Sequence, residues 1–181
     1  IPTPPATLKA PSVELFDGSK ENIFESTKPN PLNFYGKTKL IIEDYLTGNV
    51  KAWGILQNRS GKVTRQFSAD LDGKWDGNQL ILDEKFNWTD GEVQTRQWKI
   101  NKIDDHNYEG TASDVVGKAK GYSYGPAFKF EYVLLVPVKG REIKITFDDW
   151  IFKQDDRVAI NRATMTKFGI KAVSYTHLRA H

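Results

Sequence analysis

The stretch QLILDEKFNWTDGEVQTRQWKINKI, residues 79–103, decides the fold class of this chain. Apolar and polar residues alternate on both sides of the break TDGE at residues 89–92, which is typical of two strands joined by a tight turn. Similar alternating stretches precede and follow this hairpin, at residues 50–57, 63–71, 107–113, 115–122, 127–138, 141–152 and 157–168. Nothing between them has the periodicity of a long helix, so the sequence predicts an all-β protein.

A meander of about 8 to 10 antiparallel strands must close on itself or split into two sheets, because a wide open sheet leaves unprotected edges. Strands of about ten residues span roughly 33 Å, which is long enough to tilt around a barrel and enclose a cavity. We therefore expect an up-and-down antiparallel β-barrel of the lipocalin or calycin type rather than a sandwich.

Composition divides the chain into three parts. Residues 1–44 form a proline-rich tether and an irregular extension, with four of the eight prolines within residues 1–11. At the end of this part, residues 41–48 fit either a short helical turn or a lead-in strand. Residues 45–172 form the predicted barrel domain. The ending AVSYTHLRAH resembles translated sequencing-adapter read-through, so residues 173–181 are interpreted as a non-native tail that truncates the closing strand.

Charge and residue usage exclude several classes of protein. The 26 basic and 23 acidic residues are too evenly balanced for a nucleic-acid binder. The absence of cysteine excludes disulfides and thiolate metal sites, and no apolar run is long enough to cross a membrane. The three histidines, His106, His177 and His181, are too scattered for a metal cluster or a Ser-His-Asp site. We expect no metal and no cofactor.

Several charged residues share the parity of the apolar side chains that mark the barrel interior. With one tryptophan beside them, the candidate ligand-binding residues are Arg65, Glu84, Arg96, Trp98, Asp114, Asp149 and Arg162. A buried ion without a partner is too costly to persist, so these groups must meet one another, water or a ligand. A register shift of one residue would turn all of them outward.

Two interpretations of these charges stay open. In the first, they form a structural ion-pair network that plugs the barrel. In the second, one of Arg65, Arg96 and Arg162 has no protein partner and binds an anionic head group, such as a fatty-acid carboxylate or a lipid phosphate. Barrel closure would also make Trp53 in the first strand and Arg162 in the last strand neighbours, which predicts a cation-π contact.

The ordered motifs KAWGILQNRSGKVTRQF (51–67), TDGEVQTRQWKI (89–100) and FDDWIFKQDDRVAINRATMTKFG (147–169) resemble the bacterial lipoprotein family known as domain of unknown function 3833. The resemblance runs from about Tyr45 to Gly169. It implies a lipid-anchored cysteine upstream of the tether and a location on the periplasmic side of the bacterial cell envelope, with no assigned reaction. The positions that match the family are Arg59, Arg65, Glu84, Arg96, Asp114, Asp148, Asp149 and Arg162.

These observations favour an envelope lipoprotein that binds or carries a lipid or another amphiphile in a barrel cavity without catalysis. One alternative is an enzyme that acts on such a ligand, with Asp149 or Glu84 as general acid or base. Another is a structural protein of the envelope that binds no ligand. The identity of the ligand, the oligomeric state and whether the interior is open or plugged are left open by the sequence.

Overall fold

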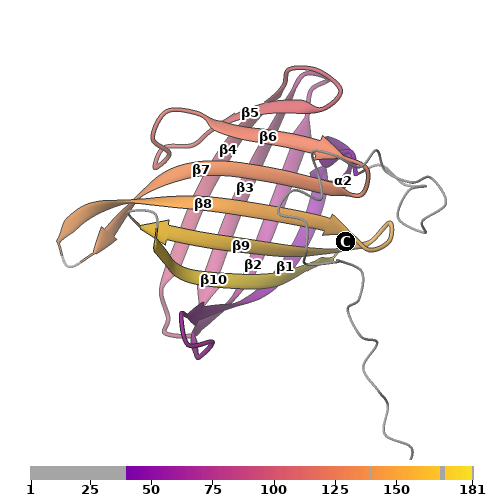
Figure 1. Cartoon of the computed structure of the whole chain (residues 1–181). Helices are drawn as coiled ribbons and strands as arrows, with labels where there is room; N and C mark the ends of the chain where they lie inside the picture. Colours follow the sequence, from indigo (N-terminus) through magenta and orange to yellow (C-terminus); the bar gives the residue numbers. More distant parts are fainter. Residues whose placement is uncertain (1–39, 139, 168–169, 181) are drawn as a thin grey trace, which may run out of the picture.

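The protein forms a closed antiparallel β-barrel in a computed structural model that describes residues 40–138, 140–167 and 170–180. One short helix, α2 (Ile42–Leu46), precedes the strands (Figure 1). The strands are β1 (Gly48–Asn58), β2 (Val63–Trp75), β3 (Gln79–Trp88), β4 (Val93–Lys102), β5 (Asn107–Thr111), β6 (Ala119–Tyr124), β7 (Ala127–Val138), β8 (Arg141–Lys153), β9 (Val158–Lys167) and β10 (Ile170–Ala180). Sequential strands pair with each other, and β10 pairs with β1 to close the ring. The predicted up-and-down barrel is confirmed.

The hairpin that decides the fold class has the predicted register. Leu82 of β3 lies opposite Trp98 of β4, and Glu84 lies opposite Arg96. The turn between them depends on Gly91, whose φ of 89° is a conformation that favours glycine and whose amide donates a 3.0 Å hydrogen bond to the carbonyl of Trp88.

The closing strand β10 lies between β9 and β1 and extends to Ala180. In the structure the barrel therefore continues past residue 172, where the sequence interpretation ended it. The proposed non-native origin of residues 173–181 stays a prediction. The predicted tether and extension, residues 1–44, lie outside the described residues except for Leu40 and α2, which show that residues 41–48 contain a helical turn.

The helix α2 closes the end of the barrel at which β1 begins (Figure 1). Leu40, Ile42, Tyr45 and Leu46 are buried in the core there. Gly73 of β2 permits this close approach, because a Cβ atom at that position would collide with the backbone carbonyl of Leu46. This end of the barrel is filled by the chain itself.

Candidate functional site

The middle of the barrel holds a group of polar side chains from strands that are far apart around the ring. Glu84 of β3 and Asp149 of β8 are only 6% and 7% exposed, although both are carboxylates. Arg96 and Trp98 of β4 point inward beside them, as the alternation of the sequence predicts. Asp114 comes from the connection between β5 and β6 and is partly buried.

Arg96 is held by two carboxylates. Its Nε and Nη2 atoms donate hydrogen bonds of 3.0 and 2.7 Å to the two carboxylate oxygens of Asp114, and its Nη1 lies 3.9 Å from Oε2 of Glu84. Burial alone would lower the pKa of Arg96, but these hydrogen bonds and charges outweigh it and raise the pKa. Arg96 is therefore ion-paired within the protein, as the network interpretation predicts.

Asp149 is held by neutral groups. The hydroxyl of Tyr132 donates a 3.4 Å hydrogen bond to its Oδ2, and the side-chain amide of Asn161 donates to its Oδ1. The same amide donates to the carbonyl of Trp150 at 3.0 Å, which fixes its orientation. Asn161 is completely buried and was not among the predicted site residues. The sequence signal that points to it is its place two residues from both Ala159 and Ala163, which are also completely buried.

The prediction that Arg162 points inward is wrong. Strand β9 buries Ala159, Asn161, Ala163 and Met165, whereas Ile160 is 38% exposed and Arg162 faces outward. This strand carries apolar residues on both faces, so alternation does not determine which face is inside. The inner face lies beside large core side chains of β8, such as Phe147 and Ile151, and alanine fits the space that remains.

The predicted cation-π contact between Trp53 and Arg162 is also wrong. Trp53 is 50% exposed on the outer face of β1. Strand β10 separates β1 from β9, so Trp53 pairs with Leu178 and Arg162 pairs with Thr176.

Arg65 lies near the barrel end opposite α2. Its guanidinium group is 4.0 Å above the ring of Trp88, and it forms ion pairs of 2.7 Å with Asp90 and 2.6 Å with Glu92. Hydrogen bonding to Asp90 is the main cause that raises the pKa of Arg65. The expectation that an inward arginine would lack a protein partner is therefore wrong for Arg65, as it is for Arg96.

An enclosed cavity of about 50 Å³ lies among the central polar groups. Its walls are formed by Leu46, Leu82, Glu84, Phe86, Arg96, Trp98, Ile100, Phe128, Phe130, Tyr132, Asp149 and Ile151. A drug-sized ligand needs roughly 300 Å³ or more, whereas one water occupies about 30 Å³ in the liquid. The cavity therefore has room for a small polar group but not for a whole amphiphile.

The barrel end opposite α2 is less tightly filled. Five apolar side chains that pack against the core from the strand ends there are only partly buried: Leu56, Phe86, Trp88, Val136 and Ile145. We call these residues the mouth. Phe86 belongs both to the mouth and to the wall of the enclosed cavity, so the two regions adjoin.

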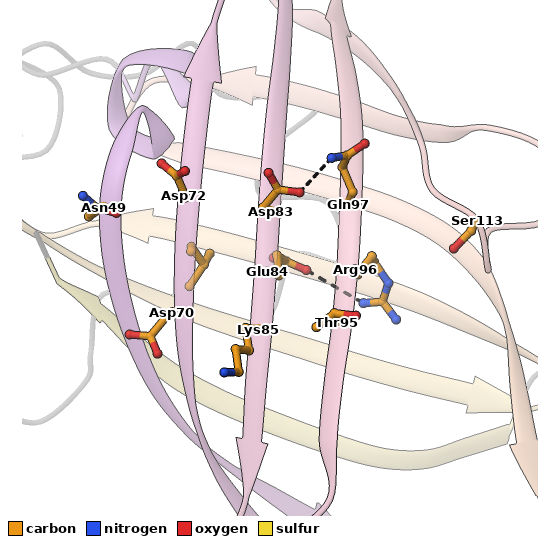
Figure 2. Close-up of a pocket in the computed structure, with 11 residues that line it drawn as sticks. Asn49, Asp70, Asp72, Asp83, Glu84, Lys85, Thr95, Arg96, Gln97 and Ser113 are labelled. Atoms are coloured by element: carbon orange, nitrogen blue, oxygen red, sulfur yellow. Dashed lines mark hydrogen bonds and ion pairs between the residues drawn. The ribbon is translucent and has the colours of Figure 1, made fainter.

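The outer surface of the barrel carries two shallower grooves. The groove of about 490 Å³ in Figure 2 runs over β2, β3 and β4, where Asp83 accepts a 2.8 Å hydrogen bond from Gln97. Glu84 and Arg96 appear behind these strands, since neighbouring residues of a strand face opposite sides. The second groove, of about 700 Å³, runs beside Trp53, Ile55 and Ile160.

Two other kinds of site were sought in residues 40–138, 140–167 and 170–180. This part of the chain contains no group of three or more His, Asp or Glu side chains arranged to hold a metal ion. Its one helix is too short to cross a membrane. The pair Asp155-Asp156 lies in the turn after β8, where Asp155 accepts hydrogen bonds from the amides of Arg157 and Val158, as expected for a hairpin turn.

Solved structures of similar shape share only the fold with this chain. An S-type phycobiliprotein lyase from Guillardia theta aligns with a TM-score of 0.57 at 9% identity, over 80% of this chain and 92% of that one. A protein of unknown function from the DUF3598 family of Nostoc punctiforme aligns with a TM-score of 0.58 at 12% identity. That alignment covers 77% of this chain but only 48% of the Nostoc protein. No curated protein matches the chain.

Family membership follows from the sequence over most of its length. The family described as "Protein of unknown function (DUF3833)" matches residues 25–178. This range contains every predicted site residue and all but the last two residues of β10. The chain therefore belongs to the DUF3833 family.

Proposed function

We propose that this protein binds an amphiphilic small molecule, such as a lipid, inside its barrel and does not transform it. The observation that carries the proposal is the contrast between the two ends of the barrel. The α2 end is filled by buried side chains, whereas the apolar residues of the mouth remain partly exposed above a polar centre. Apolar walls around a few polar groups are the usual construction of a small-molecule site.

The similar fold of the phycobiliprotein lyase is consistent with a small-molecule site, although an identity of 9% transfers no ligand. The enclosed cavity alone is too small for an amphiphile, so the apolar tail has to occupy the mouth. This requires the side chains of the mouth to move apart, as is common when side chains adapt to a ligand.

We also propose that the protein is a lipid-anchored component of the bacterial cell envelope on the periplasmic side. The proposal rests on the resemblance of the motifs at residues 51–67, 89–100 and 147–169 to a lipoprotein family. Labelling of the natural full-length protein in its host with a radioactive fatty acid, followed by fractionation of the envelope, tests it. Unlabelled protein outside the membrane fraction would contradict it.

The geometry supports binding better than catalysis. A general acid or base needs a proton-transfer position that the substrate can reach. Asp149 is engaged by Tyr132 and Asn161, and Glu84 lies beside Arg96, all within an enclosed space. These contacts are those of a structural and binding site.

A mouth variant and a matched outer variant test the binding proposal. The full chain, purified without detergent, is titrated with 1-dodecanol while its tryptophan fluorescence is recorded, and native mass spectrometry shows what it carries after expression. Ile145→Lys places a charge in the mouth and should weaken dodecanol binding by about tenfold or more. Thr146→Lys changes the next residue, which is exposed on the outer face, and should leave binding unchanged. The proposal fails if the wild-type chain carries no lipid and binds no dodecanol, or if the two variants bind it equally.

A further inference from the structure

The wall of the enclosed cavity carries more negative than positive charge. Of its twelve described lining residues, Glu84 and Asp149 are carboxylates and Arg96 is the one cation. Both carboxylates are more than nine-tenths buried. The polar side of the cavity is therefore built to face a partner that is not an anion.

The charge of Arg96 is already matched from outside this wall. Asp114, which does not line the cavity, binds the guanidinium group through both carboxylate oxygens at 2.7 to 3.1 Å. Glu84 is farther from it, at 3.9 Å. The pair of Arg96 and Asp114 is neutral overall, which leaves the charges of Glu84 and Asp149 in excess.

The known donors to Asp149 do not remove this excess. Tyr132 and Asn161 stabilise the carboxylate by hydrogen bonds but bring no positive charge. An anionic head group would add a third negative charge in a space of low dielectric, where repulsion between like charges is strong. A fatty-acid carboxylate or a lipid phosphate is therefore the wrong partner for this wall.

The aromatic side of the cavity favours the same kind of partner. Trp98 lies 5.0 Å from Phe130 and 5.1 Å from Tyr132 between ring centroids, and all three rings line the cavity. Aromatic rings attract cations through the negative charge on their faces, most strongly where water is excluded. Carboxylates and aromatic rings around one small space together suit an ammonium group, which donates several hydrogen bonds.

We propose that the enclosed cavity receives the cationic head group of the ligand, an ammonium or a similar basic group, while the apolar tail lies in the mouth. The inference rests on the proposed binding function and specifies its ligand class. The volume of about 50 Å³ suits an ammonium-sized head. Phe86, which lines the cavity and belongs to the mouth, marks the passage from head to tail.

Three probes of equal chain length separate this inference from the proposed function. The full chain is titrated at neutral pH with dodecylammonium, 1-dodecanol and dodecanoate, each below its micelle concentration, by tryptophan fluorescence and calorimetry. Dodecylammonium should bind about tenfold or more tightly than dodecanoate, because only the cation offsets the carboxylates. Tighter binding of dodecanoate, or equal binding of all three probes, overturns the inference and leaves the proposed function in place. Binding of none of the three overturns the proposed function itself.

Variants locate the preference. Glu84→Gln and Asp149→Asn each remove one charge from the cavity wall and should each reduce the ratio of dodecylammonium to dodecanoate affinity. Asp83→Asn removes a charge from the outer face of the same strand and should leave the ratio unchanged, although it alters net charge equally. If one cavity variant does not fold, the other gives the same measurement. A ratio that falls equally in Asp83→Asn shows that the preference comes from overall charge and overturns the inference.

Discussion

Tyr108 of β5 donates a 2.9 Å hydrogen bond to Oε2 of Glu43, although 65 residues separate them in the chain. Oε1 of the same carboxylate accepts a 2.8 Å hydrogen bond from Lys102. Glu43 is only 4% exposed, so both contacts join α2 to the wall of the barrel in a region without water. They explain how a helix of five residues holds its place at the closed end.

Glu43→Gln should lower the free energy of unfolding by about 1–3 kcal/mol, because it removes the ion pair with Lys102 and leaves that ammonium unmatched. Urea unfolding followed by circular dichroism measures the change. Asp44→Asn is the matched control, since Asp44 is the next residue and is exposed. It should change the free energy of unfolding by less than about 0.5 kcal/mol. Equal effects of the two substitutions would contradict the buried contact.

The contribution of Glu43 to stability should also depend on pH. Burial raises its pKa, but hydrogen bonds from Lys102 and Tyr108 outweigh burial and hold the pKa below its ordinary value of 4.5. The stabilising contribution is therefore complete above pH 4.5 and is lost as the pH falls through the pKa of the folded state. Urea unfolding at a series of pH values should show the wild type and Glu43→Gln converging in acid. A constant difference down to the lowest pH would show that the carboxylate does not titrate as described.

A pair of neighbouring substitutions tests the register of β9. Asn161→Ala removes the amide that binds Asp149 and the carbonyl of Trp150, and should cost about 1–3 kcal/mol of unfolding free energy. Arg162→Ala changes an exposed residue on the outer face and should cost less than about 0.5 kcal/mol. Thermal and urea unfolding of both variants check the prediction. The reverse order of effects would show that β9 is shifted by one residue.

The two inward arginines should differ in their contributions to stability. Arg96→Met leaves Asp114 and the buried Glu84 without their cation and should cost roughly 3–5 kcal/mol. Arg65→Met breaks pairs whose carboxylates are about half exposed, so water and salt take over much of their stabilisation, and the cost should be about 1 kcal/mol. Unfolding at low and high salt distinguishes the two, because only the Arg65 pairs should weaken markedly with salt. Equal costs would show that burial of the central network contributes nothing.

The hairpin at residues 79–103 shows how much local sequence determines. Alternation over its two strands places Glu84, Arg96 and Trp98 on the inner face, and the structure agrees. Asp149 follows in the same way, because β8 has a single apolar parity. The all-β class, the barrel and four inward site residues were therefore predictable, since side chains alternate strictly along a strand.

The identities of the partners were decided by tertiary structure. The residue that meets Asp149 is Asn161, from a strand with apolar residues on both faces, and only packing against β8 selects which face is inside. Asp114 reaches Arg96 from a connection outside the regular strands, where alternation has no meaning. Alternation within a strand is a local property of the backbone and can be read from sequence. The choice of face in β9 and the pairing of Arg96 with Asp114 depend on how distant strands fit together when the barrel closes.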